Sequence, residues 1–190
     1  VRLNLLASDG GKAGRSEVEQ NTLGFAPSIA FGLGTDTRTV LSYQHIEQND
    51  IPDFGVPGAT IKDTLRYDAA LRHADRDNFY GSDADYDDTT SDAVLLRFEH
   101  DLSAGTTLSN QTRYAKTVRE AQFTVIRDNA GAAPTTVRRT LVGYARENTS
   151  VSNQTNLSTS FNVGSFKHTV AAGVELSHET SAASRFNGPN

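Results

Sequence analysis

The sequence predicts an all-β chain that forms part of an antiparallel transmembrane β-barrel. Three features predict this fold class: strands of about ten residues with two-residue alternation, tight turns whose flanking residues share a face, and long polar connections between the hairpins. We expect about seven strands, at residues 1–8, 20–33, 37–48, 90–102, 106–118, the later part of 140–163, and 166–179. Short turns therefore alternate with long loops.

The clearest alternation lies in residues 151–163 and 166–178, on either side of a Gly-Ser turn. In both runs the apolar side chains fall on one parity, as in strands with one wet face. Residues that flank a two-residue hairpin loop pair directly, so Val163 and Phe166 should share a face. They are the last and first members of the two apolar sets, which supports this hairpin.

Two further hairpins keep the same parity across their turns. In one, residues 94–102 and 106–114 flank a three-residue loop that ends in glycine, which suits a type I turn with a bulge. In the other, residues 23–33 and 37–45 flank the turn. Pro27 lies inside that hairpin, where we expect a bulge or a local edge, because proline cannot donate a ladder hydrogen bond.

Composition excludes several classes of protein. No run approaches the ~18 apolar residues that a membrane helix needs, which excludes a helical membrane protein. A hydrophobic share of 36% still suits a barrel, whose strands need apolar side chains only at alternate positions. The formal charge of −5, without a basic cluster, argues against a nucleic-acid partner. The absence of cysteine excludes disulfides and thiolate chemistry.

We expect the chain to be a fragment of a longer protein. It has no initiator Met and no signal peptide, and its first residues already alternate as in a strand. An odd set of strands should not close alone, because bacterial single-chain barrels have even strand numbers.

The surroundings on each side of the expected sheet determine which face should carry the apolar side chains and which the polar ones. The apolar side chains should face lipid, and the polar side chains should face a wet lumen. A soluble β-sandwich would turn the apolar face inward, but globular strands usually have only ~5–6 residues. His45, His100, His168 and His178 fall on the lipid-facing parity. We expect them at the membrane boundary rather than at a metal site, since their spacing matches no metal motif.

Five segments carry a resemblance to a known family. They are Gly24-Phe-Ala-Pro-Ser-Ile-Ala-Phe-Gly-Leu-Gly34, Thr39-Val-Leu-Ser-Tyr-Gln-His45, Asp50-Ile-Pro-Asp-Phe-Gly-Val-Pro57, Asp77-Asn-Phe-Tyr-Gly81 and Leu96-Arg-Phe-Glu-His-Asp-Leu102. Together they resemble the barrel of TonB-dependent siderophore receptors, especially the catecholate-type branch. The likeness runs in order through most of the chain, and weakens at residues 58–75 and after about residue 180.

The resemblance implies that residues 1–190 are a fragment of the barrel domain, without the plug domain and the coupling box. It implies an outer-membrane receptor and transporter for ferric siderophores, energised by the TonB–ExbB–ExbD complex through the missing N-terminal region. The ferric siderophore would be transported ligand rather than a covalently bound cofactor. Outer-membrane lipid and lipopolysaccharide would surround the barrel. The alternative is a general pore or structural barrel; an enzyme ranks third, because no Gly-x-Ser-x-Gly block is present.

The resemblance also places residues 48–89 and 118–148 outside the cell, where such receptors meet their ligand. Aromatic side chains beside Arg or Lys suit an anionic, aromatic ferric catecholate, through stacking and charge attraction. The best local set for ligand binding is Tyr67, Arg72, Arg76, Phe79 and Tyr80. The alternative is ordinary loop packing by Phe79 and Tyr80.

An acidic run, formed by Asp83, Asp85, Asp87 and Asp88, supplies the oxygen atoms that Ca²⁺ prefers. It lacks the glycine and the terminal glutamate of an EF-hand loop. We therefore expect a solvated acidic loop and no metal site.

Overall fold

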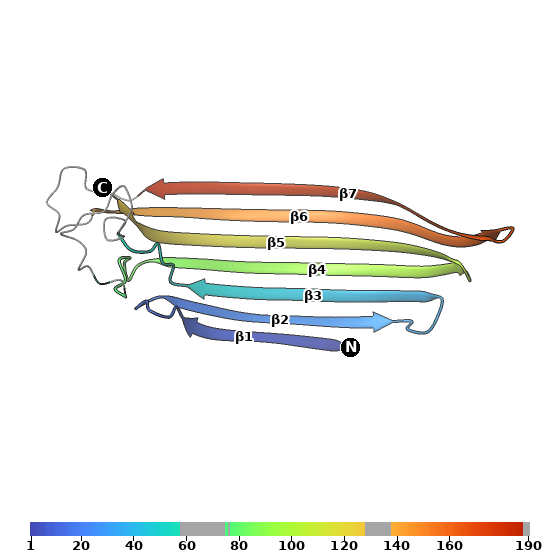
Figure 1. Ribbon diagram of the computed structural model, residues 1–190, viewed down its shortest axis with the longest axis horizontal. Coiled ribbons are helices and arrows are strands. Elements are labelled where there is room, and N and C mark those ends of the chain that lie inside the picture. Colours follow the sequence, from blue (N-terminus) through green and yellow to red (C-terminus); the bar gives the residue numbers. More distant parts are fainter. Residues whose placement is uncertain (58–74, 76, 128–137, 188–190) are drawn as a thin grey trace.

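The computed structural model is a single antiparallel sheet of seven strands, each hydrogen-bonded to the next one in the chain (Figure 1). It describes residues 1–57, 75, 77–127 and 138–187. The strands are β1 (Arg2–Gly11), β2 (Glu19–Phe31), β3 (Thr37–Asp50), β4 (Tyr86–Ser103), β5 (Thr106–Arg127), β6 (Arg138–Val163) and β7 (Phe166–Asn187). In these ranges no helix could cross a membrane. The predicted all-β, antiparallel order is confirmed.

The connections separate by length to opposite ends of the sheet. The β2–β3, β4–β5 and β6–β7 turns lie at one end, together with the N-terminus, and the strand ends that flank the remaining connections lie at the other (Figure 1). We call these the turn end and the loop end. This segregation confirms the predicted alternation of short turns and long connections.

The strands run further toward the loop end than the sequence predicts. The connections expected at residues 48–89 and 118–148 are shorter, because β4 begins at Tyr86 and the β5–β6 hairpin extends to Arg127 and Arg138. Hydrophobic alternation marks a strand only where one face is apolar. Toward the loop end both faces carry polar side chains, so the sequence lacks that pattern although the backbone pairing continues.

The β6–β7 turn has the predicted geometry. Val163 is paired with Phe166, which leaves Gly164 and Ser165 as a two-residue loop. Gly164 has a φ of 60°, as the first central residue of a type II′ turn requires. The shared parity of Val163 and Phe166 is therefore confirmed.

The β4–β5 turn differs from the prediction. Ser103 is paired with Thr106, so the loop has two residues, and the irregularity lies between Asp101 and Ser103. The backbone N–H of Ser160 donates to the Gly105 carbonyl at 2.7 Å, and a Cβ at position 105 would lie 2.6 Å from the Ser160 carbonyl oxygen. Glycine is needed here for the close approach of β6.

Pro27 interrupts the pairing of β2 with β3 without shifting its register. Phe25 is paired with His45 and Ser28 with Ser42, so the offset is the same on both sides of the proline. A bulge would change that offset, so the bulge offered for this position is wrong. The missing ladder hydrogen bond is accommodated as a local break in pairing.

The strand register brings the apolar parity of all seven strands to one face, which we call the outer face. The exposed hydrophobic side chains on it include Leu3, Leu5, Leu23, Phe25, Phe31, Leu41, Val94, Leu96, Phe98, Tyr114, Val151, Leu157, Phe161, Val163, Phe166, Val170, Val174, Leu176 and Phe186. Among the described residues, only Val18 and Ala121 are buried hydrophobics. Such a sheet lacks a second protein layer, and an apolar surface of this extent requires an apolar surrounding.

A polar quartet interrupts the outer face where β5 meets β6. The Asn110 amide nitrogen donates to Asn153 Oδ1 (3.1 Å) and Thr155 Oγ1 (2.8 Å). The Asn153 amide nitrogen donates to Asn110 Oδ1 (3.2 Å) and Thr112 Oγ1 (2.7 Å). Both amides are thereby satisfied within the quartet, which removes most of the cost of facing lipid.

This reciprocity gives a stability prediction. Asn110→Ala leaves the Asn153 amide without its main partner and should destabilise the barrel by about 1–3 kcal/mol. Replacing both asparagines with leucine removes donors and acceptors together and should recover most of that loss. The denaturant midpoint of the intact receptor in detergent measures both effects. A double variant less stable than Asn110→Ala would contradict the reciprocal arrangement.

Candidate functional site

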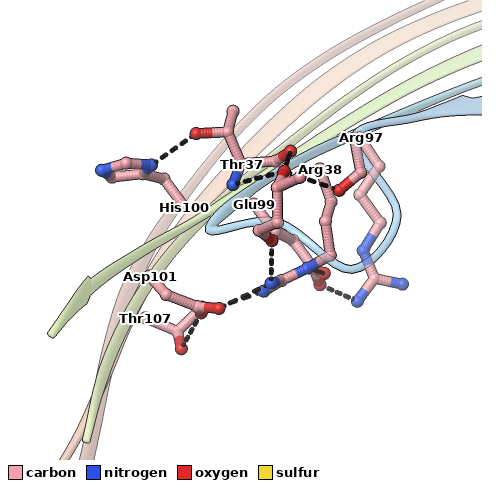
Figure 2. A network of polar contacts seen from close by, with 9 residues as sticks. Thr37, Arg38, Arg97, Glu99, His100, Asp101 and Thr107 are labelled. Atoms are coloured by element: carbon pink, nitrogen blue, oxygen red, sulfur yellow. Dashed lines mark hydrogen bonds and ion pairs between the residues drawn. The ribbon is translucent and has the colours of Figure 1, made fainter. Parts of the chain in front are cut away.

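The face opposite the outer face, which we call the inner face, carries a charge cluster near its turn end (Figure 2). The two Nη atoms of Arg38 donate to the Asp101 carboxylate at 2.6 and 2.9 Å, and Arg38 Nε donates to Glu99 at 3.4 Å. Arg97 also pairs with Glu99, and the Thr107 hydroxyl donates to Asp101 at 2.8 Å. Two arginines face two carboxylates, so this cluster is electrically balanced. It braces β3, β4 and β5 together.

The loop end of the inner face carries a second cluster, centred on Tyr144 of β6. The guanidinium carbon of Arg119 lies 5.1 Å from the Tyr144 ring centroid, and Phe123 meets that ring edge-on at 6.4 Å. Arg146 follows Tyr144 by two residues on the same face, and Arg185 of β7 is paired directly with Tyr144. Since paired residues lie side by side, three arginines flank one phenol ring.

The second cluster is not electrically balanced. Arg119 donates from Nε to Asp87 at 2.6 Å and makes a second bond to the same carboxylate. In the part of the chain that the structure describes, Arg146 and Arg185 have no hydrogen-bond or ion-pair partner. Arg119 and Arg146 are also directly paired across β5 and β6, although like charges in that position repel. Local rules are broken in this way most often at functional sites.

Phe54 extends the aromatic surface from outside the sheet. It belongs to the segment that follows β3, and its ring stacks on Phe123 at 4.4 Å with an interplanar angle of 21°. The side chain remains half exposed, so part of it is accessible from solvent. We define the aromatic–arginine site as Phe54, Arg119, Phe123, Tyr144, Arg146 and Arg185.

The set predicted from the sequence is only partly described by the structure. Tyr67, Arg72 and Arg76 lie outside the described residues. The Phe79 N–H donates to Ser16 Oγ at 3.2 Å, and the Tyr80 hydroxyl donates to the Asp75 carbonyl at 2.7 Å. Among described residues, no ring contact joins Phe79 or Tyr80 to the aromatic–arginine site. Their role in ligand binding stays a prediction.

The sequence interpretation missed Arg119, Phe123, Tyr144 and Arg146 because it treated residues 118–148 as a loop. It missed Arg185 because the last expected strand ended at residue 179. A loop has no inner or outer parity, so nothing distinguished Phe123 and Tyr144 from other aromatic residues. The usable signal was the continuation of the strand parity, which puts both rings on the polar face. Large aromatic side chains on a wet face suggest contact with a ligand.

The acidic run is a structural element at this end of the sheet. The Asp85 carboxylate is buried, and it accepts hydrogen bonds from the Thr124 N–H (2.9 Å), the Thr124 hydroxyl (2.8 Å) and the Ser82 N–H (3.1 Å). The expected solvated loop is therefore wrong for Asp85, because this carboxylate ties the start of β4 to β5. Asp87 is likewise engaged, by Arg119.

Three of the outer-face histidines have neighbours that account for them, and one of these is His100, whose Nδ1 lies 2.8 Å from Thr37 Oγ1. His45 Nδ1 lies 2.8 Å from Asp92 Oδ1, and the His168 ring stacks on Phe161 at 5.5 Å. Within the described ranges, no three His, Cys, Asp or Glu side chains are grouped so that they could hold a metal ion.

A one-layer sheet with an apolar outer face, a polar inner face and long loops at one end is the wall of an outer-membrane β-barrel. No family model matches the chain. The chain is 40% identical over 194 residues to the catecholate siderophore receptor Fiu of Escherichia coli K12, across 95% of this chain and 26% of that protein. It is 32% identical to the probable TonB-dependent receptor BfrD of Bordetella pertussis, across 98% and 25%.

A solved structure agrees with these matches. The crystal structure of the ferric-catecholate import receptor Fiu in its closed form matches with a TM-score of 0.86 and 39% identity, covering 95% of this chain and 27% of that one. The chain is thus a homologue of the barrel wall of TonB-dependent siderophore receptors, and it spans about a quarter of the length of its curated relatives. These homologues are outer-membrane transport receptors, not enzymes. The predicted resemblance, partial barrel and outer-membrane location are confirmed.

The buried Asp85 carboxylate gives a prediction for the loop end. Asp85→Ala leaves the Thr124 N–H without its acceptor, and should cost about 1–3 kcal/mol of local stability. Hydrogen exchange should then accelerate in residues 82–86 and 122–126 of the intact receptor. Exchange near the β6–β7 turn serves as the internal control and should not change. Uniform acceleration of both regions would show that Asp85 supports the whole sheet instead.

Proposed function

We propose that the chain forms part of the wall and ligand-binding mouth of an outer-membrane receptor that imports a ferric siderophore of the catecholate class. One observation carries this proposal: Tyr144 is flanked by Arg146 and Arg185, which lack anionic partners among the described residues. The similarity to a catecholate siderophore receptor supports the same ligand class.

The chemistry of the site matches that class of ligand. A ferric catecholate has a net negative charge and presents flat aromatic rings edged by oxygen atoms. Guanidinium groups form short, charge-assisted hydrogen bonds with such oxygens. The Phe54, Phe123 and Tyr144 rings offer stacking surface beside them, where ring contacts contribute beyond simple burial. Arg119 is held by Asp87, and so supports the Tyr144 ring rather than adding free charge.

We further propose that the remainder of the receptor supplies the plug and the coupling segment. In this arrangement, residues 1–190 belong to the barrel domain, and the TonB–ExbB–ExbD complex provides energy through the N-terminal region. The names of the relatives support the dependence on TonB. The outer face meets membrane lipid, and its loop end meets lipopolysaccharide.

Arg146 and Arg185, which have no anionic partner among the described residues, give a direct test. Arg146→Ala and Arg185→Ala should each weaken binding of a ferric tris-catecholate by about tenfold or more, since a hydrogen bond to a charged group contributes ~1.5–3 kcal/mol. Fluorescence quenching of the intact receptor measures the affinity. Lys167→Ala is the matched control, because Lys167 lies on the inner face at the turn end. Its affinity should not change.

Asp87, the carboxylate paired with Arg119, gives a prediction of increased rather than decreased affinity. Asp87→Asn removes a negative charge beside the site while keeping a hydrogen-bond acceptor, so anion affinity should rise by roughly two- to fivefold, as expected for an exposed charge pair. In a general pore without siderophore specificity, neither the arginine substitutions nor Asp87→Asn should change the affinity for a ferric catecholate. If the intact receptor responded equally weakly to ferric catecholates and ferric hydroxamates, the siderophore proposal would fail.

A further inference from the structure

The guanidinium of Arg15 donates hydrogen bonds to the residues on both sides of Phe54, which are Asp53 and Gly55. Arg15 donates from Nε to Asp53 Oδ2 at 3.0 Å and from Nη2 to Asp53 Oδ1 at 2.7 Å. The same Nη2 donates to the Gly55 carbonyl at 3.1 Å, and the Gly55 N–H closes the turn by donating to Asp53 Oδ1 at 2.8 Å. Phe54 is therefore bracketed by two residues that are both bound to Arg15.

The ion pair is buried although it lies among loops. Only 9% of the Arg15 side chain and 6% of the Asp53 side chain are exposed, whereas Lys12, at 3.4 Å from Asp53, is 60% exposed. Burial alone would raise the pKa of Asp53, but hydrogen bonds from Arg15, Gly55 and Lys12 and the charge of Arg15 hold it below its ordinary value. Charged groups are seldom buried unless paired in this way.

The segment that carries Arg15 is itself anchored to its neighbours. The Ser16 N–H donates to the Asp77 carbonyl at 3.0 Å, and the Ile51 N–H donates to the Glu19 carbonyl at 2.9 Å. Val18 is one of the two buried hydrophobic residues in the described ranges. Arg15 therefore belongs to a segment that is itself hydrogen-bonded and packed against its neighbours, and this segment limits the movement of Arg15.

We infer that the Arg15–Asp53 pair is a positioning device that fixes Phe54 on Phe123. The part of the aromatic–arginine site formed by Phe54 is therefore in place before the ligand binds. This inference rests on the proposed function. Arg15 and Asp53 act through Phe54 and do not themselves contact the ligand. A ring fixed before binding loses little conformational freedom when a flat ligand stacks on it, so affinity increases without a new contact. Such a device favours siderophores with aromatic rings over those without.

A double-mutant cycle on the intact receptor tests the inference. Phe54→Ala and Arg15→Ala should each weaken binding of a ferric tris-catecholate by about fivefold, within the range for one aromatic contact. In the Phe54→Ala background, Arg15→Ala should have no further effect, because residues that act through one another are non-additive. Affinity for a ferric hydroxamate should change less than twofold in all three variants.

Two further variants separate positioning from a loss of folding. Lys12→Ala removes the exposed cation and leaves the two hydrogen bonds from Arg15 to the Asp53 carboxylate intact. The affinity of this variant for the ferric tris-catecholate should therefore match wild type. Arg15→Lys keeps the charge but not this pair of hydrogen bonds, so its affinity should lie between wild type and Arg15→Ala. This graded response requires folded protein.

The possible outcomes are distinguishable. If Phe54→Ala weakens binding and Arg15→Ala does not, or if the two losses are additive, the positioning inference is overturned and the proposed function stands. If Arg146→Ala, Arg185→Ala and Phe54→Ala all leave catecholate affinity unchanged, the proposed function itself fails.

Discussion

The architecture depends on one constraint, which is that a single-layer sheet has to satisfy two different solvents. Successive side chains along a strand point to opposite faces, so every strand must alternate between lipid and water within the membrane. The uniform parity from β1 to β7 meets this condition. Backbone groups in lipid must also be paired, so the free edges of β1 and β7 require neighbouring strands. The asparagines of the polar quartet obey the same requirement with side chains.

The inner face uses charge in two different ways along its length. Near the turns, arginines and carboxylates are matched, and the result is mechanical cohesion between neighbouring strands. Near the loops, Asp87 pairs with Arg119, while Arg146 and Arg185 have no carboxylate partner in the part of the chain that the structure describes. The same residue type therefore links strands in one place and, in the function proposed above, binds the ligand in another. The number of nearby carboxylates decides between these roles.

Sequence reasoning was reliable where lipid imposes a pattern, and it failed where that pattern ends. The Val163–Phe166 pairing followed from parity and turn length alone. Strand extensions to Arg127 and Arg138 did not, because both of their faces are wet. Gly105 was assigned a local turn role, but its actual constraint is the distant Ser160 backbone. The Arg15–Asp53 pair also joins distant segments, and no periodicity encodes such a contact.

The β5–β6 hairpin has an unbroken register from the pair at Thr106 and Thr159 to the pair at Arg127 and Arg138. Slippage by one residue would send every side chain to the wrong face, so this ribbon resists shear along its whole length. A force applied at Tyr144 must then bend or tilt the ribbon as a unit. The hairpin is therefore a continuous ribbon that carries Arg119, Phe123, Tyr144 and Arg146 of the aromatic–arginine site at its loop end and forms part of the sheet at its turn end.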